Sequence, residues 1–184
     1  MMRPPNQPLL EIEELVVHFT TRSGIVQGAR GVNLQVGYGE TLGLVGESGS
    51  GKSVTFQAVM GLISTPGEII SGDVRWKGRS LFSPAGRQFL KKARGKEIAM
   101  IFQDPMTSLN PVFTVGVQIG EVLRHHLAMT KKKARYRTIE LLELVDINAP
   151  EKRLKQYPHE FSGGMRQRVM IAMALACEPQ LLIA

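Results

Sequence analysis

The sequence predicts an α/β domain with a largely parallel sheet, and three observations support this prediction. The chain begins with a β-rich stretch, in which Leu9–Phe19 alternates partly between apolar and polar residues. A glycine-rich loop then separates the short apolar run Thr41–Val45 from a segment of helical character. Beyond the loop, apolar runs of strand length alternate with segments of helical periodicity, an order typical of parallel sheets.

The early elements are predicted to be strands. After Leu9–Phe19, the segments Ile25–Ala29 and Val32–Val36 are rich in strand-forming residues and are separated by a turn. The run Thr41–Val45 predicts a strand that leads into the loop. The segment Ser53–Ile63 has apolar residues at every fourth position, and this spacing predicts a helix.

The later elements alternate between strand and helix. A hairpin is predicted over 72–81, and Ile98–Phe102 has the continuous apolar character of a strand buried on both faces. The segment Lys131–Val145 carries one apolar stripe and predicts a helix. A last helix is predicted over Gly164–Ala176, and the apolar run Leu181–Ala184 follows it.

The composition is that of a globular protein. The chain has 184 residues, of which 43% are hydrophobic and 21% are charged, so it can bury a sizeable core. The single cysteine, Cys177, excludes an internal disulfide within these residues. The longest apolar run, Val169–Cys177, is too short to span a membrane. The net charge of +7 includes basic stretches over 87–96 and 131–137, for which a solvated surface is favoured over an anionic partner.

The strongest signal for function is a match to the phosphate-loop motif G-x-x-x-x-G-K-[ST] over Gly46–Ser53. Its glycines allow the backbone to approach an anion closely, and the amides of the following helix are expected to cradle phosphates. Lys52 would supply a charge for the β- and γ-phosphates, and the Ser53 hydroxyl would bind Mg²⁺. The residues predicted to contact the nucleotide here are Gly46, Glu47, Ser48, Gly49, Ser50, Gly51, Lys52, Ser53 and Val54.

Two further segments are candidate site elements. Gln103 follows the predicted strand Ile98–Phe102, at the edge where open α/β sheets bind ligands, and its amide could reach a metal or a water. Ser162, Gly163 and Gly164 precede the last helix and form a second potential anion site. Because the phosphate loop is already expected to bind a nucleotide, this second site is interpreted as binding a phosphate of the nucleotide held by another copy of the chain.

The phosphate loop, Gln103 and Ser162–Gly164 occur in an order that resembles the ATP-binding subunits of ABC transporters. The segments Phe102–Pro111 and Tyr157–Arg168 resemble the branch that serves oligopeptide, dipeptide and nickel importers. The resemblance covers residues 9 to 184. It implies a P-loop ATPase core with an N-terminal antiparallel β-subdomain and a helical subdomain.

The resemblance also implies roles for individual residues. Phe19 matches the aromatic residue that stacks on adenine, Gly46–Ser53 is the Walker A loop, and Gln103 is the Q-loop glutamine that contacts Mg²⁺ or water. Ser162–Gly164 would close on the γ-phosphate of an opposing subunit. Phe161 and Met165 depart from the commonest Leu-Ser-Gly-Gly-Gln form, and the Met165 side chain cannot donate a polar contact.

The expected organisation is a single, incomplete ABC ATPase domain over 1–184. Residues 1–103 would form the β-rich part and the phosphate-loop core, 104–178 the mainly helical subdomain, and 179–184 the Walker B strand. The sequence stops where this family places its metal-binding Asp and catalytic Glu. The 184-residue chain is therefore expected to bind ATP weakly and to hydrolyse it little or not at all.

The leading hypothesis is an ATPase subunit of a peptide importer, with ATP and Mg²⁺ as cofactors and a nickel complex as the alternative cargo. Its expected partners are transmembrane permease subunits, a second ATPase subunit and, indirectly, a periplasmic or extracellular substrate-binding protein. It would lie at the cytoplasmic side of the cell membrane and bind no nucleic acid. A P-loop kinase or nucleic-acid repair ATPase and a non-catalytic binding module remain the rival hypotheses.

Three other residues are expected to be structural. His125 and His126 are adjacent, so on a helix they are expected to point apart and to make a poor metal pair. Trp76 is interpreted as packing within the hairpin.

Overall fold

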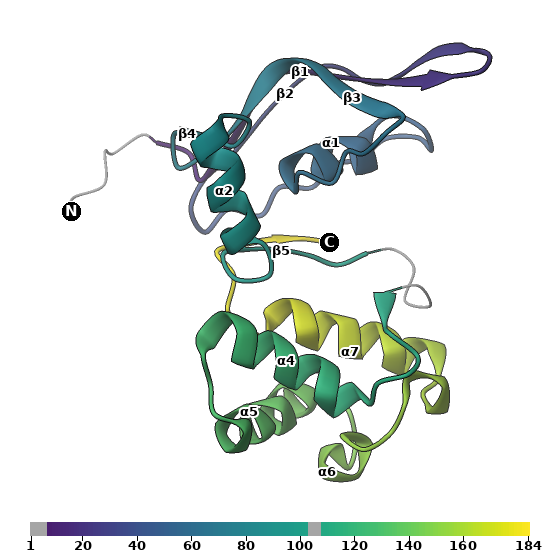
Figure 1. Ribbon diagram of the computed structural model, residues 1–184, viewed down its shortest axis with the longest axis vertical. Coiled ribbons are helices and arrows are strands. Elements are labelled where there is room, and N and C mark those ends of the chain that lie inside the picture. The colour runs from purple at the N-terminus through teal and green to yellow at the C-terminus, as the bar shows by residue number, and fades with distance from the viewer. Residues whose placement is uncertain (1–6, 103–107) are drawn as a thin grey trace. The chain divides into compact units, whose positions relative to one another are not determined.

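The structure is a computed structural model that describes residues 7–102 and 108–184. The chain divides into two compact units, Met1–Lys92 and Ala93–Ala184 (Figure 1). Strands dominate the first unit and helices dominate the second. This division of an N-terminal antiparallel sheet from a helical part agrees with the predicted fold class.

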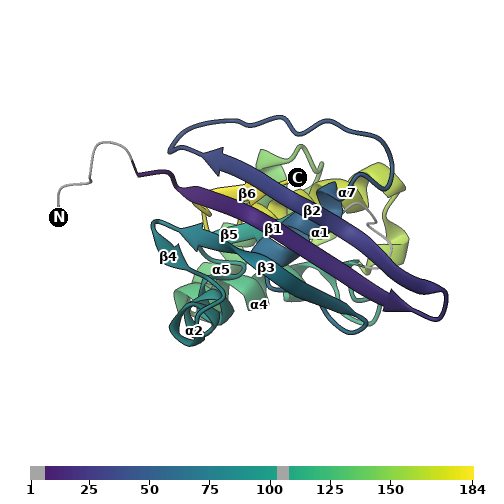
Figure 2. The same ribbon diagram turned by 90° about the horizontal axis from the view of Figure 1, so that it is seen from above.

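The first unit is built on a four-stranded antiparallel sheet with the order β2-β1-β3-β4 (Figure 2). Its strands are β1 (Leu10–Thr21), β2 (Gly24–Val36), β3 (Gly67–Trp76) and β4 (Arg79–Ser80). The strand β1 and the hairpin β3–β4 confirm two predictions. Trp76 is buried in β3, which agrees with a packing role.

The segments expected to be two strands over 25–36 are one continuous strand, β2. Its pairing with β1 shifts register next to Leu15, so the irregularity is a bulge and not a turn. At this bulge Glu14 has a φ of 43°, and its N–H donates to Asn33 Oδ1 at 3.0 Å instead of to the ladder. The chain therefore keeps its strand direction through Gly31, where the sequence suggested a break.

Two helices complete the first unit. The helix α1 (Lys52–Val59) contacts β2 and β3, and its buried residues include Ala58 and Val59. It ends earlier than predicted because the chain turns at Gly61, which has a φ of 59°. The helix α2 (Pro84–Ala93) was not predicted from the sequence.

The predicted strand over Thr41–Val45 is wrong. This segment has no regular structure, and its side chains are exposed, with Val45 at 93%. A strand requires a neighbour to pair its backbone N–H and C=O groups, and no strand of the described residues pairs with this segment. An apolar run alone therefore did not produce a strand here.

The second unit contains the only parallel pairing among the described strands. The strand β5 (Ile98–Met100) pairs in parallel with β6 (Leu181–Ile183), while the larger sheet is antiparallel throughout. The expectation of a largely parallel sheet is therefore wrong for the described residues. The strand β5 is also shorter than predicted, because Phe102 lies beyond it and is 45% exposed.

The other elements described in the second unit are helical: α4 (Val115–Leu127), α5 (Lys131–Leu144), α6 (Pro150–Arg153), the 3₁₀ turn Pro158–Glu160 and α7 (Gly163–Leu175). The helices α4, α5 and α7 contact one another around a shared apolar core (Figure 1). The predicted stripe on α5 is confirmed, because Ala134, Leu141 and Leu142 are buried in this core. No helix within 7–102 or 108–184 is long and apolar enough to cross a membrane.

Candidate functional site

The phosphate loop, defined here as Gly46–Ser53, leads directly into α1. Its last glycine, Gly51, is the N-terminal cap of the helix and has a φ of 93°, in the left-handed region. A Cβ atom at this position would lie 2.4 Å from the carbonyl oxygen of Gly28 on β2. Only glycine fits this position, because any other side chain would be strained in its backbone and would collide with a strand.

The side chain of Lys52 folds back over the phosphate loop. Its ammonium group donates to the carbonyl oxygens of Gly46 at 2.5 Å and Glu47 at 2.8 Å, and to Ser50 Oγ at 3.2 Å. A turn inside the loop, from Ser50 N–H to the Glu47 carbonyl at 3.2 Å, supports this shape. The positive charge is therefore held at the loop by the loop's own backbone.

The amides at the start of α1 face the same loop. The first hydrogen bond of the helix runs from Thr55 N–H to the Gly51 carbonyl at 2.9 Å, and the Thr55 hydroxyl donates to the same oxygen at 2.9 Å. The N–H groups of Lys52, Ser53 and Val54 therefore precede the first helical bond, as at any helix N-terminus. Together with the Lys52 charge and the helix dipole, they form a site suited to phosphate oxygens.

Ser53 is the candidate ligand for Mg²⁺ in the loop. It is exposed at the second position of α1, so its hydroxyl is accessible beside the free amides. Mg²⁺ usually takes few protein ligands and completes its shell with phosphate oxygens and water, so a single hydroxyl at a phosphate site fits this ion. Within the described parts of the chain, no three His, Cys, Asp or Glu side chains form a metal cluster.

Phe19 lies near the phosphate loop because both approach Gly28, a residue that was not predicted to belong to the site. A Cβ atom on Gly28 would lie 2.6 Å from Phe19 Cε2 and 3.1 Å from Val54 Cγ1, and the Gly28 carbonyl faces Gly51. Gly28 thus brings the half-buried Phe19 ring, Val54 and the loop together. A second bare position, Gly67 on β3, leaves room for the other edge of the ring. Glycines inside strands signal close approach of this kind and could have identified both positions.

The segment Ser162–Gly164 belongs to the second unit and forms the exposed tip of α7. Ser162 is the N-terminal cap, and its hydroxyl accepts a hydrogen bond from Met165 N–H at 3.3 Å. A Cβ atom on Gly163 or Gly164 would meet no atom within 4 Å, so the tip is open. Phe161 is buried in the helical core and Met165 is half-buried against it, so both residues that depart from the common motif serve packing. Gln103 lies outside the described residues.

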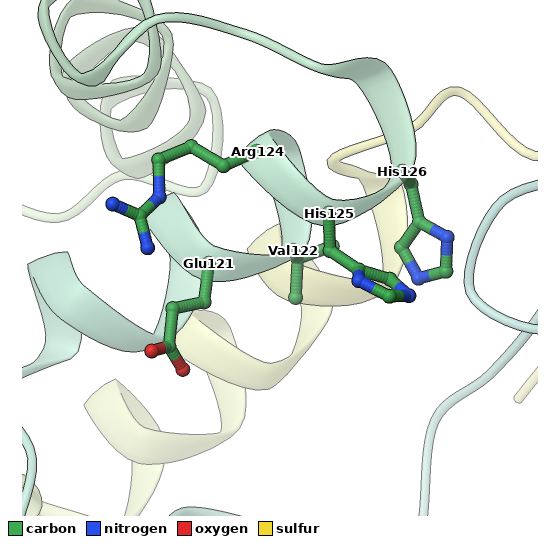
Figure 3. A pocket seen from close by; sticks show the side chains of 5 residues that line it. All are labelled: Glu121, Val122, Arg124, His125 and His126. Atoms are coloured by element: carbon green, nitrogen blue, oxygen red, sulfur yellow. The ribbon is translucent and has the colours of Figure 1, made fainter.

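A cavity of about 640 Å³ in the second unit lies beside α4, and its lining includes His125 and His126. The prediction that these side chains point apart is wrong, because their rings are in edge-to-face contact with centroids 4.7 Å apart (Figure 3). Glu121 and Arg124 point away from the two rings in this view. Burial, followed by the nearby charges of His125 and Lys96, lowers the pKa of His126 below its ordinary value of 6.5.

A loop of glycines with a lysine over it, opening a helix, defines a nucleotide-binding protein of the P-loop class. The family model described as ABC transporter matches residues 29–184, and the chain belongs to this family.

The chain is also similar to named transport proteins. It is 58% identical over 177 residues to the oligopeptide transport ATP-binding protein OppD of Bacillus subtilis, covering 96% of the chain and 49% of that protein. It is 52% identical over 179 residues to the dipeptide transport ATP-binding protein DppD of Haemophilus influenzae, covering 96% of the chain and 53% of that protein. The chain spans about half the length of the curated relatives it matches.

Solved structures share the fold. The dimeric, post-hydrolysis state of the ATP-binding cassette MJ0796, bound to ADP and Pi, superposes with a TM-score of 0.81 at 26% identity, covering 94% of this chain and 72% of that chain. The cbiO1 protein of Clostridium perfringens, part of the transporter complex cbiONQ, gives a TM-score of 0.71 at 25% identity, covering 96% and 64%. The fold is therefore that of an ABC ATPase, in agreement with the prediction.

Proposed function

We propose that this protein is the ATP-binding subunit of a peptide importer and couples ATP binding and hydrolysis to uptake of peptides. The observation that supports this most directly is the phosphate loop, where the Lys52 ammonium lies over the loop and the first amides of α1 are free. Membership in the ABC transporter family supports the same conclusion. The names of its relatives refer to oligopeptide or dipeptide transport. These names favour a peptide over a nickel complex as the cargo.

In this proposal, the nucleotide phosphates accept hydrogen bonds from the backbone N–H groups of Lys52, Ser53 and Val54. The Lys52 ammonium would exchange its bonds to the loop carbonyls for stronger, charge-assisted bonds to phosphate oxygens. The rest of the loop, Gly46–Gly51, would surround the β-phosphate. The Phe19 ring, which lies within reach of Val54 through Gly28, would contact the adenine base.

Mg²⁺ would be held by the Ser53 hydroxyl and by Gln103, and when bound it would neutralise charge on the β- and γ-phosphates. The exposed tip Ser162–Gly164 would approach the γ-phosphate bound to a second ATPase subunit, which explains why this helix start is open rather than packed. Permease subunits and a substrate-binding protein would complete the transporter. The subunit would act at the cytoplasmic side of the membrane.

The test is an ATP titration of the 184-residue chain by calorimetry, with and without Mg²⁺, beside the variant Lys52→Ala. Hydrogen bonds to charged groups contribute about 1.5–3 kcal/mol, so the variant should bind ATP roughly tenfold to a hundredfold more weakly. The matched control is Lys132→Ala, which removes an exposed lysine on α5 and should leave the affinity unchanged. If Lys52→Ala binds ATP as well as the unaltered chain, the phosphate loop is not the nucleotide site and the proposal fails.

A further inference from the structure

The chain between Asp73 and Glu97 contains no acidic residue but many basic ones. Within the first unit, several of these cations lie on α2 and on the short strand before it. The α2 basic face is defined here as Arg79, Arg87, Lys91 and Lys92. None of the functions proposed above uses this surface.

The position of α2 fixes which side of the helix faces solvent. Leu90 and Ala93 are buried at 3% and 0%, and a Cβ atom on Gly86 would lie 1.9 Å from the Ser80 carbonyl oxygen. The helix therefore packs within the first unit, with Gly86 close to β4 and Leu90 close to Gly61 beyond the end of α1. Ser83 caps its start, because its hydroxyl accepts from Gly86 N–H at 3.0 Å. With 3.6 residues per turn, Lys91 and Lys92 lie towards the opposite side of the helix, and Arg87 lies on its flank.

The two arginines of this face are held by uncharged groups. The Arg79 guanidinium lies over the Phe89 ring, 4.9 Å from its centroid, and Arg87 Nε donates to the Phe82 carbonyl at 2.9 Å. Lys91 and Lys92 are exposed in the last turn of α2. None of the ion pairs found within 7–102 and 108–184 includes a residue of this face. No carboxylate of the described residues therefore pairs with the positive charges of this face.

A cluster of cations without anionic partners does not stabilise the folded protein. Arg87 and Lys91 are four residues apart on one side of the helix, and like charges at this spacing destabilise a helix. A partner that supplies negative charge would relieve this repulsion. The helix presents a convex, charged side, which suits a broad anionic surface better than it suits a single small ligand.

We propose that the α2 basic face binds the phosphate groups of anionic lipids at the membrane surface. The proposal rests on the proposed function, which brings this subunit to the cytoplasmic side of a membrane. Lys91 and Lys92 provide exposed point charges of the kind that binds lipid headgroups. Nucleic acid is a weaker match, because the Phe89 ring is half-buried beneath Arg79 and cannot stack on a base.

The test is sedimentation of the 184-residue chain with vesicles of equimolar phosphatidylglycerol and phosphatidylcholine, without nucleotide. A membrane-facing lysine contributes about fivefold in affinity, so Lys91→Gln with Lys92→Gln should weaken binding by roughly 25-fold. The matched control is Lys152→Gln with Lys155→Gln, two exposed lysines outside both basic stretches, which removes the same charge and should change binding little. Vesicles of phosphatidylcholine alone should not bind the chain.

Three outcomes would overturn the proposal: no binding to the anionic vesicles, equal weakening by both pairs of substitutions, or tighter binding to a DNA duplex that is lost in the Lys91 and Lys92 variant. Circular dichroism melts of both variants exclude loss of folding as the cause. The ATP titration is a separate readout. If the chain does not bind vesicles but its ATP affinity depends on Lys52, only the proposed lipid site is wrong. If the chain binds vesicles but its ATP affinity does not depend on Lys52, the proposed nucleotide function is wrong.

Discussion

Replacing Gly51 by alanine is expected to destabilise the first unit by about 2–5 kcal/mol. Two costs add at this position. A residue other than glycine in the left-handed region costs about 1–2 kcal/mol, and Gly51 has a φ of 93°. The new Cβ would also lie 2.4 Å from the Gly28 carbonyl oxygen, and overpacking of this kind costs about 1–3 kcal/mol.

Gly49→Ala is the matched control in the same loop. Gly49 has a φ of 81°, but a Cβ atom there would meet nothing within 4 Å, so only the backbone cost of about 1–2 kcal/mol applies. The difference between the two variants therefore measures the contact between the phosphate loop and β2.

Urea unfolding followed by tryptophan fluorescence is the suitable assay. The chain has a single tryptophan, Trp76, which is 2% exposed and lies in the same unit as the loop. Its emission should shift when this unit unfolds. If Gly51→Ala and Gly49→Ala are equally stable, the close approach of Gly51 to Gly28 is not a feature of the folded protein, and the reasoning about Phe19 and Val54 around Gly28 fails with it.

Two further variants test the second unit. Ser162→Ala removes the cap of α7 and should lower the free energy of unfolding by about 1 kcal/mol in a urea titration followed by circular dichroism; an unchanged midpoint would contradict the cap. Because the pKa of His126 is lowered in the folded state, the unfolded chain binds the proton more tightly, so stability should fall as the pH drops through 6.5 towards the folded pKa. His126→Asn should remove that part of the pH dependence, and a variant with the same slope as the unaltered chain would show that His126 is not its source.

The phosphate loop and the helices α1, α5 and α7 were the most predictable features, because their signals are local. The stripe on α5 and the motif over Gly46–Ser53 depend on residues within a few positions of one another. The helix α2 was missed although Ser83 and Pro84 mark its start, since its short, lysine-rich sequence shows only a narrow apolar side.

Strands were less predictable, because a strand depends on residues far away in the sequence. Thr41–Val45 has the composition of a buried strand, but no described neighbour pairs with it, and it remains exposed. In β2, by contrast, pairing with β1 carries the strand through Gly31, where local residues suggested a turn. In both cases, the presence or absence of a pairing strand, and not the local preference, decided whether a strand formed.

The amino-acid sequence alone was sufficient to identify the phosphate-loop motif and the family, because both depend on the types and spacing of residues close together in the chain. The folded chain was needed to show how Phe19, Val54 and Gly51 meet at Gly28, and how His125 and His126 come into ring contact. These contacts depend on strand register and on side-chain rotamers. Both are set by packing between segments distant in sequence, so no local pattern predicts them.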